Sequence, residues 1–424
     1  MVASDHILSK PEVYETKQIQ LTSPILHIGS AVSKLSPFEY VATSKRVYLP
    51  NSEVLARAFQ QQGRLNEYIR RIENQEDITT LLQATFGDDW ENACDSNKEA
   101  IFPKHTSSLK WTQQKITDLR PMIRNGFGQL YIPGSSIKGA IRTAIAYHLL
   151  KHADHYQIPK GERVSEIERR LRQKIGNLKQ QAKFSDDTLF MNQLFTDFNL
   201  IYQDKPVLGK VSLQNSDFMR VVKITDTEPL LEKKIDQRGQ AIYLNQPIVT
   251  EVIISSRFPD RQAKYRASIY SEMVRNVKTQ FTISIDQEML SWFQHKQAMR
   301  LPFNKVDDIL NICKEFAQDQ WDYEHDYWLG VDDNLSSSSI KLNFSEIRNL
   351  YEPEECPHHL RIGWASGMIG TTVNLLFEDE LREQIRDSCG LKAPGFEAPK
   401  SRRTVVDRQG KIKYIPGWVK FKIL

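Results

Sequence analysis

Two hydroxyls and two cations stand at phosphate-binding spacing in the stretch Tyr131–Arg142, which reads Tyr-Ile-Pro-Gly-Ser-Ser-Ile-Lys-Gly-Ala-Ile-Arg. The four residues are Ser135, Ser136, Lys138 and Arg142. The Pro-Gly pair ends a strand-like run, and a serine is placed to cap a helix that continues through Ala140–Leu150. The i,i+4 spacing puts both cations on one face, beside the unpaired N–H groups of the first turn. The stretch therefore predicts a helix N-terminus that binds a phosphate.

The stretch Tyr131–Arg142 lacks the spacing of a P-loop, which bears on the kind of phosphate it binds. A P-loop requires a set spacing between its first glycine and a Gly-Lys-Ser/Thr triplet, and that spacing is absent here. The backbone of a nucleic acid is therefore favoured over a nucleoside triphosphate. The competing interpretation is a capped core helix whose two cations are only solvated.

The composition of the 424 residues is that of a globular protein, with 40% hydrophobic and 26% charged residues. This length holds two to three domains of ordinary size. Met1–Lys10 is polar and no apolar run reaches the length of a membrane span, so we expect a cytoplasmic protein without membrane contact. The four cysteines lie far apart without a Cys-x-x-Cys pair, which argues against a disulfide framework and a cysteine zinc site.

The net charge of +4 is unevenly distributed. Lys400–Leu424 holds eight Lys or Arg against the single Asp407, and Lys160–Lys183 holds eight against three Glu. Clustered cations release counterions from a phosphate backbone, so both segments are candidate nucleic-acid surfaces. In Lys160–Lys183, however, apolar residues recur at helical spacing, which leaves open a plain amphipathic helix with a solvated face.

The elements that must position these groups form an α+β pattern, which predicts two ferredoxin-like (RRM-like) units with helical insertions. We predict an N-terminal domain over 1–220, with an inserted segment at about 63–125, and a C-terminal domain over 221–424. Strands are expected at Gln18–Ile28, Val207–Phe218, Ala241–Ser256, Leu360–Ile362, Arg402–Val406 and Gly417–Ile423. Helices are expected at Ser52–Gln61 and within Asp286–Gln320, and a loop at Ser336–Ser339.

Several motifs together resemble the RAMP superfamily, the RNA-binding proteins of CRISPR effector complexes. The first is the Pro-Gly-Ser-Ser-Ile-Lys-Gly-x-x-Arg signature described above. The others are the His-Ile-Gly turn of Leu21–Gly29, Phe38–Val41, the glycine-rich Gly363–Gly370, and Pro399–Arg403 followed by Gly417–Lys420. The ending resembles one RAMP family in particular, the subunit conventionally numbered fifth in the Csm complex of type III-A CRISPR effectors. The motifs frame nearly the whole chain except 63–125, which matches none of them.

The resemblance implies a non-catalytic subunit that binds the guide RNA (crRNA) toward its 3′ end and supports guide maturation and complex assembly in antiviral defence. Its implied partners are the CRISPR guide RNA, neighbouring RAMP subunits, and host nucleases that trim the guide 3′ end. The glycine loop would contact the RNA backbone and the basic tail would clamp phosphates. The residues assigned to these roles are Gly363, Trp364, Gly367, Gly370, Lys400, Arg402 and Arg403. No cofactor and no metal are assigned, and Trp418 is expected to pack in the core.

A catalytic alternative is a metal-independent endoribonuclease that uses His27 as general acid and base. Such chemistry needs a second group to stabilise the scissile phosphate, and the sequence indicates none. Target-cleaving RAMP subunits use an Asp after the first strand, whereas Gly29–Glu39 contains no Asp, which favours a binding subunit. A scaffold that contacts only protein also remains open.

Two groups of ligand-type residues are not assigned a metal. Cys356, His358 and His359 have no partner pair at zinc spacing. Asp322–Asp326 could form a hard-cation site, but acidic residues that alternate with aromatic ones are more simply a half-buried surface element or a subunit contact.

Overall fold

The computed structural model describes residues 13–177, 187–207, 215–231, 233–235, 241–243, 246–336 and 340–424. Three sequence predictions lie partly or largely outside these residues. They are the end of the basic segment Lys160–Lys183, most of the strand predicted at Val207–Phe218, and most of the loop predicted at Ser336–Ser339.

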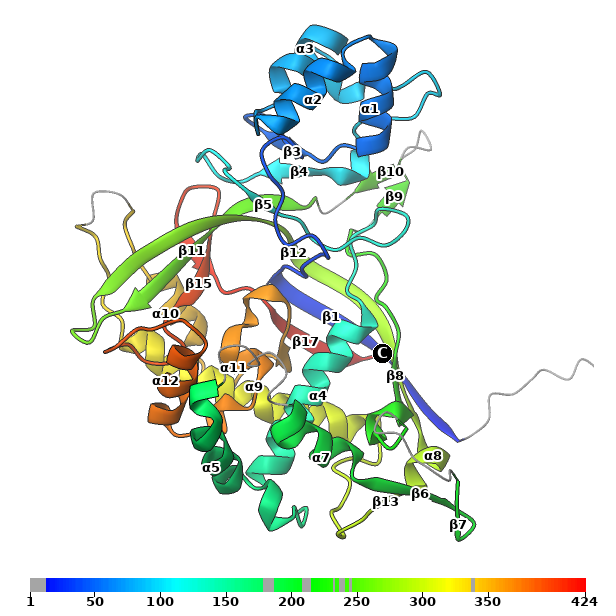
Figure 1. The fold of residues 1–424 in the computed structure, drawn as a ribbon, viewed down its shortest axis with the longest axis vertical. Helices are drawn as coiled ribbons and strands as arrows, with labels where there is room; N and C mark the ends of the chain where they lie inside the picture. The colour runs from blue at the N-terminus through cyan, green and yellow to red at the C-terminus, as the bar shows by residue number, and fades with distance from the viewer. Residues whose placement is uncertain are drawn as a thin grey trace, which may run out of the picture.

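One long strand, β12 (Ala263–Asp286), connects the two parts of the main sheet (Figure 1). Its first half pairs antiparallel with β11 (Ile248–Arg257), and its second half pairs antiparallel with β1 (Tyr14–Leu26). β1 also pairs with β17 (Trp418–Ile423), so strands from the two ends of the described chain are neighbours. The strand order is β14-β17-β1-β12-β11-β4-β3-β2.

The second half of β12 forms a strand because its apolar side chains alternate with polar ones. The buried positions are Val277, Thr279, Phe281, Ile283 and Ile285, while the residues between them are more exposed. This period of two directs one face of a strand to the core. Sequence analysis did not predict β12, although this alternation was the signal that could have identified it.

Two helices that contact each other cover the inner face of the sheet, α4 (Gly134–Lys151) and α9 (Val306–Leu329) (Figure 1). Their apolar residues join those of β1 and β12 in the largest core cluster. This core takes side chains from both predicted halves of the chain. The mixed α+β class is confirmed, whereas the division into two ferredoxin-like domains stays a prediction.

The segment after the first strand forms a separate helical layer at the top of Figure 1, with α1 (Ser52–Gln61), α2 (Leu65–Glu73) and α3 (Thr79–Phe86). It has its own core, centred on Phe59. α1 has the predicted bounds, and Asn51 caps it with its side-chain oxygen. Further along, β4 (Ser107–Lys110) and β5 (Leu119–Arg120) leave this layer and pair with β11 and β12.

The predicted strands β14 (Leu360–Arg361), β15 (Arg402–Val406) and β17 are confirmed, and the strand predicted at Ala241–Ser256 divides into β10 (Ala241–Tyr243) and β11. The helical region predicted over Asp286–Gln320 contains α8 (Gln287–Ser291), a short strand β13 (Phe293–His295) and α9. The remaining strands are β2 (Val41–Ala42), β3 (Arg46–Tyr48), β6 (Phe198–Tyr202), β7 (Lys205–Pro206), β8 (Val222–Ile224), β9 (Lys233–Ile235) and β16 (Ile412–Tyr414). The remaining α-helices are α5 (Val164–Lys174), α7 (Asn192–Thr196), α10 (Ser345–Tyr351), α11 (Gly367–Thr371) and α12 (Asp379–Ser388). None of the helices in the described part of the chain has the length and apolarity needed to cross a bilayer.

Candidate functional site

The start of α4 differs from the sequence prediction, because neither serine caps the helix. The first helical residue is Gly134, and its N–H donates to Asp226 Oδ1 at 2.8 Å. A carboxylate from a neighbouring loop therefore does the capping expected of Ser135 or Ser136. Gly134 is required at this point, since a Cβ there would lie 2.4 Å from the carbonyl oxygen of Ile224. Ser135 is exposed and Ser136 half-buried, so their hydroxyls remain near the surface.

The two cations of this helix are held by the protein itself. Lys138 Nζ donates to Val222 O at 2.7 Å, and Arg142 Nη1 donates to Asp217 Oδ2 at 2.6 Å. The Arg142 guanidinium also lies over the Phe195 ring, 3.8 Å from its centroid. Burial lowers the pKa of Lys138. Lys138 therefore ties α4 to the start of β8 and Arg142 ties it to the segment before β8, and a phosphate bound here would share Arg142 with Asp217. Their contact with RNA stays a prediction.

The predicted glycine loop places an aromatic ring beside the end of β1. Gly363 has φ +87°, and a Cβ on it would lie 2.3 Å from the carbonyl oxygen of His27. The backbone N–H of Trp364 donates to that same oxygen at 3.2 Å, and the Trp364 ring lies edge-on to the His27 ring. Gly370 packs tightly too, with a Cβ position 2.9 Å from the Cβ of Ser366. At Gly367 the φ is +67°, and no atom of the described residues outside its immediate chain neighbours lies within 4 Å of a Cβ position.

Two arginines from distant segments lie close to the ring of Trp364. The guanidinium carbon of Arg120, from β5, lies 5.0 Å from the ring centroid, and that of Arg403, from β15, lies 4.8 Å away. Together with His27 these residues form what we call the Trp364 cluster. Neither arginine has an ion pair with a carboxylate among the described residues. Both are half-buried, so the group they form is partly open to solvent.

The Trp364 cluster has a surplus of positive charge. Burial lowers the pKa of Arg403, and the charges of Arg361 and Arg120 lower it further. Burial likewise lowers the pKa of His27, with a smaller contribution from Arg120 in the same direction. Among the described residues, Arg361 is the one of these three arginines with an ion pair to a carboxylate, at 3.8 Å from Glu324. Guanidinium groups beside an aromatic face are suited to bind a phosphate and to stack on a nucleobase.

The basic tail does not form one continuous clamp, because β15 turns neighbouring residues to opposite faces. Arg402 is 5% exposed, and its Nε lies 2.9 Å from Glu324 Oε1, with the guanidinium stacked on Tyr327 at 3.9 Å. This corrects the prediction that Arg402 faces a phosphate, since its charge is neutralised in the interior. Lys400 is half-buried and lies over the ring of Phe396. Only Arg403 points into the Trp364 cluster.

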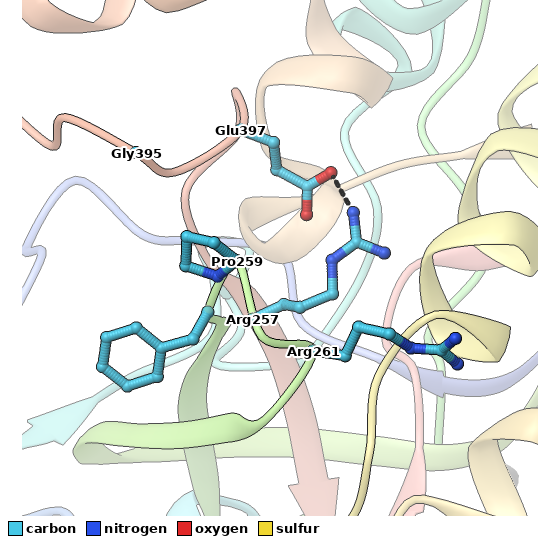
Figure 2. A pocket seen from close by; sticks show the side chains of 6 residues that line it. Arg257, Pro259, Arg261, Gly395 and Glu397 are labelled. Carbon is cyan, nitrogen blue, oxygen red and sulfur yellow. Dashed lines mark hydrogen bonds and ion pairs between the residues drawn. The ribbon is translucent and has the colours of Figure 1, made fainter.

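A second cationic surface surrounds a pocket of about 350 Å³ at the turn between β11 and β12 (Figure 2). Its lining residues are Arg257, Phe258, Pro259, Arg261, Gly395 and Glu397. Arg257 points toward Glu397 and pairs with it at 2.7 Å, whereas Arg261 points away from that pair. Because Glu397 neutralises Arg257, we expect this pocket to attract an anion less strongly than the Trp364 cluster does.

Of the other residues considered from sequence, His27, His358 and Glu324 are buried, whereas His359 is half-buried and Asp322 and Asp326 are exposed. His27 is 2% exposed, and its Nδ1 lies 2.7 Å from the carbonyl oxygen of Glu272. His358 is stacked on Trp418, which is buried in the core as predicted. Glu324 contacts Arg402 and accepts a hydrogen bond from Trp328 Nε1. In α5, most described cations of the basic helix are paired with Glu or Asp, which supports the solvated amphipathic face.

Sequence reasoning missed Arg120, the second cation of the Trp364 cluster. It follows Leu119 in a two-residue strand, where no local pattern marks it. Its position depends on the pairing of β5 with β12, where Arg120 is opposite Ser271. The contact of Arg120 with Trp364 joins segments about 240 residues apart, so neither segment alone predicts it.

Comparisons with known proteins bear on the family and the fold of the chain. A model of the RAMP superfamily matches residues 18–329. A curated relative, the CRISPR system Cms protein Csm5 of Enterococcus italicus, is 24% identical over 172 residues, 35% of this chain and 49% of the relative, so the match spans about half the relative's length.

Two solved structures are similar in fold. A chain of a Csm-crRNA-target RNA ternary complex of a type III-A CRISPR-Cas system superposes with a TM-score of 0.57 and 20% identity, over 96% of this chain and 100% of that one. The crystal structure of T. onnurineus Csm5 gives a TM-score of 0.53 and 18% identity, over 95% and 100%. Since the family model covers most of the sequence, the chain belongs to the RAMP superfamily.

Proposed function

We propose that this chain is a non-catalytic subunit of a type III CRISPR effector complex and that it binds the guide RNA toward its 3′ end. Membership of the RAMP superfamily and similarity to Csm5 support a role in a crRNA-containing complex. One similar structure is a chain of a complex that contains crRNA and target RNA, which supports RNA and neighbouring Csm subunits as partners. In this role the chain would also support guide maturation, with host nucleases trimming the guide 3′ end.

The observation that carries the proposal is the pair of carboxylate-free arginines over Trp364. A half-buried cluster of like charges is costly unless an anion compensates it. An RNA backbone supplies that anion, and an unstacked base can lie on the aromatic and guanidinium planes. Gly367, which has open space around it, provides backbone beside the same loop that a ligand can approach closely.

The buried position of His27 supports a binding role over the endoribonuclease alternative. A general acid or base must come within hydrogen-bond reach of the proton it transfers. The His27 ring is almost fully buried, its Nδ1 contacts Ser271 Oγ and the carbonyl oxygen of Glu272, and burial lowers its pKa. These contacts give the ring a structural task at the end of β1.

The RNA contact is tested with the purified full chain and a labelled single-stranded RNA that carries a guide 3′ end. We expect Arg403→Gln and Arg120→Gln each to weaken binding about tenfold, which equals about 1.4 kcal/mol. Each variant also reduces the slope of log affinity against log salt by about 1, because one phosphate contact is lost. Binding is measured by fluorescence anisotropy over a series of salt concentrations.

Arg408→Gln is the matched control, since it removes the same charge from the exposed turn that follows β15. Equal affinities for wild type, Arg403→Gln and Arg120→Gln would contradict the proposed site. Cleavage of a guide precursor by the wild type, lost in His27→Ala, would contradict the non-catalytic role. Crosslinking of RNA to the assembled complex tests the end preference, and crosslinks at Trp364 from the 5′ end of the guide would contradict it.

A further inference from the structure

A cluster of two histidines and a glutamate joins the last turns of α4 to the middle of α9. His148 lies in the last turn of α4 and His152 is the residue that caps its C-terminus, so the i,i+4 spacing puts both rings on the same side of the helix end. Glu315 faces them from α9, which packs directly on α4. The sequence analysis did not single out these residues, because the two helices are far apart in the chain.

The ligand-type atoms of the three side chains converge on one point. His148 Nδ1 contacts Glu315 Oε2, and His152 Nε2 lies 2.7 Å from Glu315 Oε1. All three ligand atoms lie within 4.8 Å of one another. The side chains are 15%, 40% and 27% exposed in the order His148, His152, Glu315, so an ion can reach them from solvent.

We propose that His148, His152 and Glu315 bind a divalent transition-metal ion, with zinc as the best match to the donor set. Two imidazole nitrogens and a carboxylate are ligands that Zn²⁺ prefers, and three protein ligands leave a coordination position for water. An ion between them would replace the direct histidine–glutamate hydrogen bonds by metal–ligand bonds.

Tyr156 is placed to orient His148 as a metal ligand. The hydroxyl of Tyr156 lies 2.8 Å from His148 Nε2. When this hydroxyl accepts a hydrogen bond from the Nε2–H of His148, the Nδ1 lone pair is free to face the ion. Outer contacts of this kind orient metal-bound histidines and typically change metal affinity 10- to 100-fold when removed.

One cation competes with the ion for Glu315. Lys151 Nζ lies 3.0 Å from Glu315 Oε1 and 2.5 Å from Asp319 Oδ2. Asp319 also accepts a hydrogen bond from Tyr147 at 2.8 Å, so it stays in place to hold Lys151 when the ion takes Glu315. The ammonium group repels a nearby dication, which predicts that removing Lys151 strengthens metal binding.

The proposed ion would link α4 to α9, and both helices carry charged side chains discussed above. α4 also carries Lys138 and Arg142, and α9 carries Glu324, which holds Arg402 and Arg361. A metal bond between the helices therefore stabilises their packing without taking part in RNA binding. This role is independent of the proposed function and is measured on the protein alone.

The test uses the purified full chain, freed of metal with a chelator and then titrated with Zn²⁺ or Co²⁺. We expect one equivalent to bind, to raise the unfolding temperature and, for Co²⁺, to give visible absorption bands typical of nitrogen and oxygen ligands. His152→Ala, at the most exposed ligand, abolishes these changes. Lys151→Met binds the ion severalfold more tightly than the wild type.

His155→Ala is the matched control, because His155 lies in the same region, is exposed and is not part of the cluster. It retains the full metal response. The proposal is overturned if the wild type binds neither ion, or if His155→Ala loses as much affinity as His152→Ala. Weaker binding by Lys151→Met would also overturn the arrangement proposed for Glu315.

Discussion

Arg402 and Arg403 are adjacent in the sequence and lie on opposite faces of β15. Arg402 is neutralised by Glu324 in the interior, whereas Arg403 faces Trp364 without a carboxylate partner among the described residues. A basic motif read as one clamp therefore separates into a structural residue and a candidate ligand contact. At the scale of single residues, the partner of each charge decides its role more than the motif does.

The two positive-φ glycines of the Gly363–Gly370 loop give a prediction at this scale. Both have φ and ψ values that only glycine adopts readily, so alanine costs on the order of 1–3 kcal/mol at either position. At Gly363 a Cβ would also lie 2.3 Å from the carbonyl oxygen of His27, whereas at Gly367 it meets open space. Gly363→Ala therefore lowers the free energy of unfolding more than Gly367→Ala, as measured by urea denaturation. Equal losses of unfolding free energy in the two variants would show that the close approach of Gly363 to the His27 carbonyl does not affect stability.

At the scale of elements, a buried ion pair fastens the segment after β5 to the middle of β12. Glu272 is 1% exposed and accepts two hydrogen bonds from Arg124, at 2.6 and 2.8 Å. Ser108 Oγ and the Met122 N–H donate to the same carboxylate, at 2.6 and 3.0 Å. Four donors compensate for the burial of this charge, and these contacts hold the pKa of Glu272 below its ordinary value although burial alone would raise it.

Removal of the Glu272 carboxylate is expected to be strongly destabilising. Glu272→Ala leaves the Arg124 guanidinium buried without its partner, which costs about 3–5 kcal/mol. The exposed pair of Arg57 with Glu99 is the matched control, and Glu99→Ala costs at most about 1 kcal/mol. Both values follow from chemical denaturation of the purified variants. A loss at Glu272 as small as that at Glu99 would contradict the role given to this pair.

At the scale of the whole molecule, sequence reasoning succeeded where a single segment determines its own structure. The first strand, the bounds of α1, and β15 follow from local periodicity and capping. It did not locate what depends on contacts between distant segments: Arg120 beside Trp364, Asp226 at the start of α4, and Glu324 under Arg402. These contacts arise from sheet pairing and from helix packing on the sheet, and neither can be predicted from the sequence around each residue.

The whole molecule also has an acid sensitivity that its buried histidines predict. Burial lowers the pKa of both His358 and His359 to about 4. Between about pH 6.5 and 4 the unfolded chain therefore binds protons that the folded chain does not, so the free energy of unfolding falls as the pH falls through this window. Below about pH 4 both states are protonated and the histidine contribution no longer changes. The half-buried carboxylate of Glu315, whose pKa is lowered to about 2, loses its contribution only below about pH 4.3.

The variant His358→Phe isolates this effect, because a phenyl ring can keep the stacking on Trp418 and does not titrate. His358 Nδ1 has no hydrogen-bond partner among the described residues, so the substitution removes no polar contact at that atom. We expect the loss of unfolding free energy between pH 6.5 and 4 to be smaller than in wild type by up to about 3 kcal/mol. Urea denaturation at a series of pH values measures it. Parallel profiles for the two proteins would mean that His358 is protonated in the folded state, and that the packing of β17 against α9 tolerates a charge at its centre.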